Sequence, residues 1–256
     1  MYKSEYPTRL QKNVIVDVVF EIRFDAKKGF SNLVPGIAHK LFGENSKIDN
    51  HPVHNLPAHI RESNPELRYQ PIVRIEWDSV VLMIGDYSLG IGYGTNYPGW
   101  EVFKTHIQKL TDWLDQDDLL KSMINTVERY SLKYVDFIPE EQYSHCQLPF
   151  LVSAKLGDQE VDSHHKLRLQ FESVTNFGFC LFDFNKPIQA VVDNQDVGRG
   201  ALIITDALRN LNPTVGISDF LKDLEEHKDE MHLTNKRLFF KSLSDELLKI
   251  LGAQYD

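Results

Sequence analysis

The sequence predicts an α+β fold in two halves, each with a mixed β-sheet covered by helices. Segments that alternate apolar and polar residues indicate strands, and segments with apolar residues three or four apart indicate helices. A polar connector over residues 139–149 separates the halves. We expect a ferredoxin-like half over residues 1–139 and a second half over residues 150–256, a β-sheet with C-terminal helices.

The first half opens with one strand and one helix. Residues 13–25 (NVIVDVVFEIRFD) alternate between apolar and mostly charged side chains, which is typical of a half-buried strand. Residues 31–43 have helical spacing, with Ser31 as the expected N-cap and Gly43 as the expected end. Residues 44–70 are polar and hold several prolines and histidines, so we expect a long loop there.

Three strands are expected next, over residues 72–77, 80–85 and 88–94. The last of them, SLGIGYG, carries Gly90, Gly92 and Gly94 at every second position. A dinucleotide fingerprint needs glycines two and then three apart, and a Walker loop ends in Gly-Lys-Ser/Thr, so neither motif fits. On a strand the three glycines share one face, where a neighbouring backbone or a ligand can approach closely.

An amphipathic helix and a long strand complete the first half. Residues 98–116 (PGWEVFKTHIQKLTDWLDQ) place Trp100, Phe103 and Ile107 on one stripe, with Pro98 just before the helix. Residues 125–138 (NTVERYSLKYVDFI) alternate as a strand does. The order strand–helix–strands–helix–strand is that of a ferredoxin-like sandwich with an extra strand.

The second half is expected to contain strands followed by helices. The two helices cover residues 218–230, with Ser218 as the cap, and residues 236–251. The five expected strands are residues 151–157, 166–174, 177–184, 189–194 and 200–208.

Composition excludes several function classes. The chain has 256 residues and a net charge of −9, and most of the excess negative charge follows residue 139. An acidic balance argues against a nucleic-acid partner, which would call for a basic patch. We find no signal peptide and no apolar stretch of membrane-spanning length, so we expect a cytoplasmic protein with no membrane partner. Cys146 and Cys180 form no disulfide framework.

No catalytic or metal-binding constellation is complete. Residues 225–232 (EEHKDEMH) hold several metal-capable side chains, but His227 and His232 are five residues apart rather than four, and no third ligand is indicated. We therefore expect a solvated helix face, no metal and no cofactor. There is no G-x-S-x-G elbow, and Cys180 lies among apolar residues that would make its thiol buried and inert. We assign no catalytic residue.

Five residues are candidates for binding: Trp100, Arg129, Tyr134, Asp229 and His232. Arg129 alternates with the tyrosines of its strand, which indicates either an ordinary solvated face or a basic edge that contacts an anion. Trp100 is interpreted either as a core residue or as part of an aromatic groove. Asp229 and His232 are three residues apart and share a helix face.

Four short motifs spread over nearly the whole chain carry a resemblance. They are VIVDVVFEIRF (residues 14–24), YPGWEVF (97–103), RYSLKYVDFI (129–138) and DEMHLTNKRLF (229–239). Through them the chain resembles a sporadically distributed family of uncharacterised bacterial and archaeal proteins of about this size. The chain departs from the family pattern at Asp136, where asparagine is usual, and at Ser131. The family's scattered distribution is similar to that of mobile-element, toxin–antitoxin and phage-defence genes, and it brings no activity with it.

Our leading hypothesis is a non-catalytic protein-interaction module, with another protein or a second copy as partner. The alternative is an enzyme or small-ligand binder at the seam between the halves. There Arg129 would hold an anion, His232 would act as acid–base, Asp229 would orient it, and Tyr134 would join them. A third hypothesis, RNA binding on the first sheet, rests on fold analogy alone.

Overall fold

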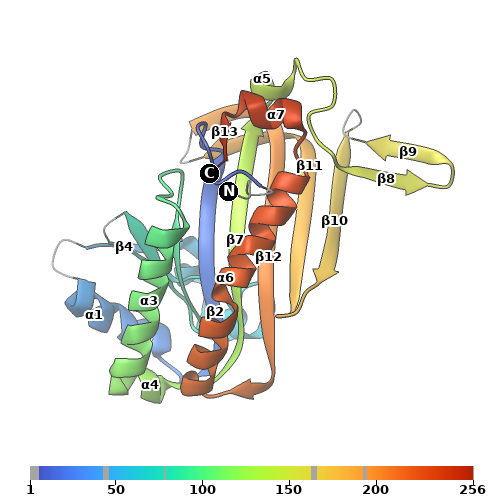
Figure 1. The fold of residues 1–256 in the computed structure, drawn as a ribbon. Helices are drawn as coiled ribbons and strands as arrows, with labels where there is room; N and C mark the ends of the chain where they lie inside the picture. The colour runs from blue at the N-terminus through green and yellow to red at the C-terminus, as the bar shows by residue number, and fades with distance from the viewer. Residues whose placement is uncertain (1–5, 43–45, 78, 163–165, 193–194, 256) are drawn as a thin grey trace. The chain divides into compact units, whose positions relative to one another are not determined.

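The computed structural model describes residues 6–42, 46–77, 79–162, 166–192 and 195–255 (Figure 1). Helices and antiparallel strands make up these residues, which confirms the predicted α+β class. In the described ranges, no helix is both long and apolar enough to cross a bilayer.

Nine strands form one sheet, and every neighbouring pair with a described register is antiparallel. Strands of both predicted halves belong to it. In spatial order they are β10 (Leu167–Val174), β11 (Phe179–Val192), β12 (Gln195–Val215), β7 (Ile124–Pro139), β2 (Ile15–Ala26), β6 (Ser88–Tyr93), β5 (Val80–Ile84), β4 (Val73–Trp77) and β3 (Lys47–Asn50).

Two small sheets and eight described helices complete the fold. One sheet pairs β1 (Arg9–Leu10) with β13 (Ala253–Gln254), and the other pairs β8 (Ser153–Leu156) with β9 (Gln159–Asp162). The helices are α1 (Phe30–Phe42), the 3₁₀ helix η1 (Pro52–Asn55), α2 (Ala58–Ser63), α3 (Trp100–Gln116), α4 (Asp118–Met123), α5 (Glu140–Tyr143), α6 (Ile217–Lys241) and α7 (Asp245–Ile250).

The chain divides into two compact units. The first unit comprises Met1–Asp17, Lys133–Ala207 and Glu230–Asp256, and the second comprises Val18–Leu132 and Leu208–Asp229. By residue number, β2, β7, β12 and α6 each contribute to both units. The predicted boundary at residues 139–149 and the ferredoxin-like arrangement of the first half stay predictions.

Each unit has its own apolar core. In the first unit, β7, β10 to β12, the segment before β8 and the C-terminal helices supply it. Among its members are Ile138, Phe150, Phe184, Ile203 and Leu247. In the second unit the largest fully buried side chains are Phe20, Phe24, Phe30, Phe103, Phe220 and Tyr130. The aromatic residues predicted on strands and helices therefore lie mostly in cores.

The predicted elements of the first half are confirmed except for the long loop. Residues 44–70 contain β3, η1 and α2, so the loop prediction is wrong for the described part. All four residues of β3 are exposed, and its antiparallel pairing with β4 comes from backbone hydrogen bonds. A strand with two exposed faces has no apolar alternation, and so the pattern could not reveal it.

In the second half, β9 was not predicted, β12 is longer than the predicted strand over residues 200–208, and one predicted strand is not separate. Residues 189–194 were expected as a separate strand, but β11 is continuous from Phe179 to Val192. Pro187 lies just past Lys186, the last residue of β11 that pairs with β10. A proline there costs no hydrogen bond to β10, because that neighbour has already ended.

The predicted break between the two C-terminal helices is also wrong. α6 runs without interruption from Ile217 to Lys241. The intervening residues 231–235 (MHLTN) contain no glycine or proline, and Met231 and Asn235 in this stretch are both buried. α6 therefore stays helical and packed through residues where the apolar periodicity alone indicated a gap.

Neither serine predicted as a helix cap serves as one. α1 begins at Phe30, one residue after Gly29 at φ 90°, and the Ser31 hydroxyl instead donates to Asp86 Oδ1 at 2.6 Å. α6 begins at Ile217, before Ser218. Gly43, the predicted end of the first helix, lies outside the described residues.

The glycine stretch is a strand packed closely against a neighbouring backbone, as one of its two interpretations predicted. β6 is buried along its whole length and pairs with β2. A Cβ atom on Gly90 would lie 2.7 Å from the carbonyl oxygen of Phe20, and one on Gly92 would lie 2.6 Å from that of Val18. Both positions therefore require glycine. Gly94 follows the strand and is exposed.

Candidate binding site

Helix α3 forms one wall of the candidate site in the second unit. Its apolar residues recur at helical spacing, and the side that they form is buried, with Phe103, Ile107 and Leu110 almost fully covered. Gly99 precedes the helix at φ 103°, a conformation that glycine adopts without strain. Trp100 therefore opens the helix where the sequence pattern predicted a helix start, and its side chain is half-buried.

The part of α6 within the second unit forms the opposite wall, and Asp223 anchors it. The Tyr130 hydroxyl on β7 donates to Asp223 Oδ2 at 2.7 Å, and Arg209 on β12 donates from Nε at 2.8 Å. Burial alone would raise the pKa of Asp223. Hydrogen bonds from Arg209 and Tyr130 outweigh it and hold the pKa below the usual 3.8. Asp223 is thus a charged anchor shared by two strands.

A second aspartate of α6 ties the helix to α3. Trp100 Nε1 donates to Asp229 Oδ1 at 2.9 Å, and Lys104 Nζ donates to Asp229 Oδ2 at 2.5 Å. Burial opposes ionisation of Asp229, but these two donors together hold its pKa below the usual 3.8. Two of the predicted binding residues, Trp100 and Asp229, are therefore in direct contact, and Lys104 completes their cluster.

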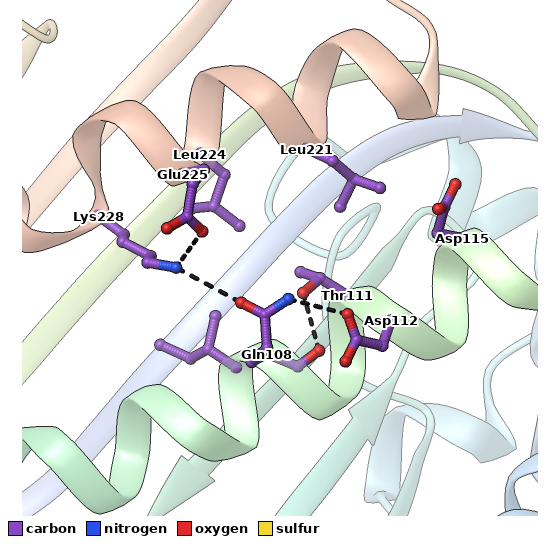
Figure 2. Close-up of a pocket in the computed structure, with 9 residues that line it drawn as sticks. Gln108, Thr111, Asp112, Asp115, Leu221, Leu224, Glu225 and Lys228 are labelled. Atoms are coloured by element: carbon purple, nitrogen blue, oxygen red, sulfur yellow. Dashed lines mark hydrogen bonds and ion pairs between the residues drawn. The ribbon is translucent and has the colours of Figure 1, made fainter.

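Between these walls lies a groove of about 210 Å³, which we call the α3–α6 groove (Figure 2). Its apolar lining comes from both helices, and two of its apolar residues, Ile107 and Leu224, are almost fully buried. Carboxylates of Asp112 and Asp115 stand on the α3 side. The full lining is Ile107, Gln108, Thr111, Asp112, Asp115, Leu221, Leu224, Glu225 and Lys228.

Lys228 is the one cationic residue of this lining, and it is already engaged. Its side chain is 7% exposed, and its ammonium group contacts the Glu225 carboxylate and lies 3.5 Å from Gln108 Oε1. The amide of Gln108 in turn donates to Asp112 Oδ1 at 2.8 Å. Figure 2 shows this chain of contacts crossing the groove from α6 to α3.

The other predicted pair lies in the first unit. The Tyr134 hydroxyl and His232 Nδ1 are hydrogen-bonded at 3.0 Å, and their ring centroids are 5.9 Å apart. One helical turn further, buried Asn235 accepts a hydrogen bond from the Cys180 thiol at 3.3 Å. Burial raises the pKa of Cys180 to about 12, so the thiol is protonated at neutral pH, in keeping with the prediction of an inert cysteine.

The fifth predicted residue has a different partner. Arg129, in the second unit, lies 3.6 Å from the Glu21 carboxylate on β2. The structure thus brings together Trp100 with Asp229 in one unit and Tyr134 with His232 in the other. A single site built from Arg129, Tyr134, Asp229 and His232 stays a prediction.

The metal-capable residues around His232 have ordinary partners. His227 Nδ1 lies 2.8 Å from the carbonyl oxygen of Asp223, and Glu230 pairs with Arg237 at 3.2 Å. Within the described ranges, no three histidine, cysteine or acidic side chains are placed to share a metal ion.

Sequence reasoning missed Asp223, Arg209 and Lys228. Each is a charged residue in an acid-rich or polar stretch, where spacing gives no sign of burial. A helical-wheel projection of residues 217–229 would have placed Lys228 on one side with Leu224, one turn away, and Leu221, two turns away. This is the signal that could have found it.

Comparison with known proteins adds no relative. The chain matches no family model, and no curated protein matches it. The resemblance carried by the four motifs therefore stays a prediction.

Proposed function

We propose that this chain is a non-catalytic protein-interaction module and that its α3–α6 groove binds a partner segment bearing lysine or arginine side chains. The observation that carries the proposal is the composition of the groove: a mostly polar lining with three carboxylates around a small apolar floor, whose one lining cation is already paired. A lysine or arginine suits both parts, because its alkyl stem packs on apolar surface while its charged head stays near carboxylates.

The charges of the lining support this choice of partner. Asp112 accepts from the neutral amide of Gln108, so this contact leaves its charge uncompensated. Asp115 has an exposed pair with Lys121 at 2.7 Å, which a competing cation can replace at little cost. The remaining negative potential attracts a basic segment and raises its rate of association.

The two aspartate anchors support a preformed groove. Asp223 fixes α6 to Tyr130 and Arg209, and Asp229 fixes it to Trp100 and Lys104. A site whose walls are held before binding loses less conformational entropy when a partner docks. This role assigns Trp100 and Asp229 to positioning the groove rather than to contacting the partner.

The proposal also includes the finer predictions from sequence: a cytoplasmic location, a ferredoxin-like first half, and a gene context of mobile elements, toxin–antitoxin pairs or phage defence. In such loci the natural partner would be the product of an adjacent gene. We therefore expect that product to present a basic amphipathic segment.

The test uses fluorescent peptides of defined charge. An amphipathic Leu/Lys peptide of about 12 residues is titrated with the protein in fluorescence anisotropy, beside the same peptide with every lysine replaced by glutamine. We expect the double variant Asp112→Lys/Asp115→Lys to bind the Leu/Lys peptide at least about ten-fold more weakly than the wild type.

The matched control is Glu66→Lys/Asp219→Lys, which makes the same change in net charge at exposed positions outside the groove lining. We expect it to bind within about two-fold of wild type at 0.15 M salt. Equal weakening in both double variants would show non-specific charge attraction and overturn the proposal. Unchanged binding by the groove variant would overturn it as well.

A further inference from the structure

Strand β10 ends the nine-stranded sheet. Its inner side pairs with β11 over its whole length, from Leu167 opposite Lys186 to Val174 opposite Phe179. Within the described residues, no strand pairs with its outer side, and β8–β9 forms a separate two-stranded sheet. An edge of eight residues that is neither short nor interrupted by proline is a template for another strand.

The turn that joins β10 to β11 determines which backbone groups point outward. The Thr175 amide donates to the Gly178 carbonyl at 2.9 Å, so this is a hydrogen-bonded pair of the ladder. Because hydrogen-bonded pairs alternate with non-hydrogen-bonded ones, the odd-numbered residues of β10 bond to β11. The N–H and C=O groups of Arg168, Gln170, Glu172 and Val174 therefore point away from the sheet.

We propose that a second copy of the chain pairs with β10, antiparallel, across a two-fold axis at Gln170. This interface lies in the first unit and is independent of the α3–α6 groove. A two-fold axis requires each strand to present the same surface to the other. Centring it on Gln170 joins outward-pointing residues to outward-pointing residues, which gives about six backbone hydrogen bonds between the copies.

The charges of β10 select this register. With the axis at Gln170, Arg168 of each copy lies opposite Glu172 of the other. With the axis at Arg168 or at Glu172, a like charge faces itself. With the axis at Leu169 or at Phe171, which also joins outward-pointing residues, Arg168 faces Gln170 or Val174 instead of Glu172, so only the axis at Gln170 pairs the two charged residues of β10 with each other. Opposite charges across an antiparallel pair are stabilising and like charges are destabilising. Arg168 is 70% exposed and lies 3.8 Å from Asp183, so it is free to swing toward a second carboxylate.

The same register covers an apolar side chain that the single chain leaves open. Phe171 is 40% exposed although its ring stacks near Phe182, with centroids 5.1 Å apart. In the dimer it faces Leu169 of the second copy in a non-hydrogen-bonded pair, where side chains are closest. Burial of this aromatic edge adds a hydrophobic term to the backbone pairing.

Charge exchange tests the register directly. Sedimentation velocity over a range of protein concentrations should show reversible dimers of the wild type. Glu172→Arg places like charges opposite each other and should weaken association by about ten-fold or more. The double variant Arg168→Glu/Glu172→Arg restores opposite charges and should recover association to within about three-fold of wild type.

A cysteine at the axis tests the geometry. Gln170→Cys in a Cys146→Ser background should form a disulfide between copies on mild oxidation, because facing Cα atoms would be about 5.5 Å apart. Glu172→Cys is the matched control, since its two copies would be on the order of 14 Å apart along the strands. Gln170→Pro removes the central outward N–H without breaking a bond to β11, and should abolish the dimer while circular dichroism stays unchanged.

Three results would overturn the proposal. The first is a chain that stays monomeric at every soluble concentration. The second is a dimer that Glu172→Arg and Gln170→Pro leave intact, which would place the interface elsewhere. The third is equal crosslinking of the two cysteine variants, which would indicate random collision.

Discussion

The two ends of α6 are held by different chemistry. In the second unit, the carboxylates of Asp223 and Asp229 receive hydrogen bonds from arginine, lysine, tyrosine and tryptophan. In the first unit, contacts of the same helix join His232 to Tyr134 and Asn235 to Cys180. One continuous helix therefore carries ionic anchors at its start and a hydroxyl, imidazole, thiol and amide set further on.

The difference extends to the titration of aspartates. Donors hold the pKa values of Asp223 and Asp229 below the ordinary value. Asp136 in the first unit is 3% exposed, and burial raises its pKa to about 8. Among the described residues, no hydrogen bond or ion pair reaches its carboxyl group. The comparison teaches that an aspartate stays charged where hydrogen-bond donors contact its carboxylate and is protonated at neutral pH where burial acts alone.

Asp136→Asn should give the largest effect, and one that depends on pH. The unfolded Asp136 loses its proton near pH 3.8, whereas the folded one keeps it until about pH 8. Between these values the folded state binds more protons, so wild-type stability falls as pH rises, by at most about 1.4 kcal/mol per pH unit from this group. Asparagine does not titrate. The free energy of unfolding of Asp136→Asn, measured in urea, should therefore rise relative to that of the wild type from pH 5 to pH 7.5. A difference that stays the same at every pH would contradict the raised pKa of Asp136.

Asp223→Asn should come next, with a loss of about 2–3 kcal/mol at neutral pH. The variant leaves the Arg209 guanidinium, only 27% exposed, without its anionic partner. Asp219→Asn is the control on the same helix, since Asp219 is 71% exposed and its pair with Lys222 should contribute less than about 1 kcal/mol. Because the folded pKa of Asp223 lies below the usual 3.8, its contribution to stability is present above about pH 4 and is lost as pH falls further. If Asp223→Asn and Asp219→Asn lost the same unfolding free energy, Asp223 would not be an ionic anchor of α6.

Tyr134→Phe should have a smaller effect, about 1 kcal/mol, through loss of the hydroxyl that meets His232. The ring stays in place, so packing is preserved. Because the hydroxyl that is removed carries no charge at neutral pH, urea unfolding in 0.05 M and 0.5 M salt should give the same loss. A loss that shrinks at high salt would mean that this end of α6 is held ionically after all.

Lys104→Met should have the smallest effect, about 0.5 kcal/mol, and it should decrease with salt. Lys104 is 30% exposed and Asp229 is 53% exposed, so solvent already screens their contact. Methionine keeps most of the alkyl stem. Measured beside Tyr134→Phe, this variant sharpens the contrast, because only the Lys104→Met loss should shrink with added salt.

The local sequence pattern predicted most helices and strands, but not which strands lie beside one another in the sheet. Alternation found β2 and β7, and helical spacing found α1 and α3, because each has an apolar side that is buried. Alternation also found β6, which is buried on both faces. The local pattern missed β3, which is exposed on both faces, and it divided α6 at residues whose buried members include the polar Asn235. Strand order depends on pairings between distant segments, such as Glu21 with Gly90, that no local pattern contains.

The candidate site was predictable in part. The motifs singled out Trp100, Tyr134, Asp229 and His232, and these four residues form two contacting pairs. The α3–α6 groove was not predictable, because its lining combines residues more than 100 positions apart and its charged members look like any solvated helix face.

The glycines of β6 also limit how this protein can vary. Every other genetically encoded amino acid carries the Cβ atom that the carbonyl groups of Phe20 and Val18 exclude. No codon change at Gly90 or Gly92 is thus structurally silent unless it is synonymous, and surrounding positions cannot easily compensate because the obstruction is main chain rather than side chain. Drift in the rest of the sequence should leave these two positions fixed.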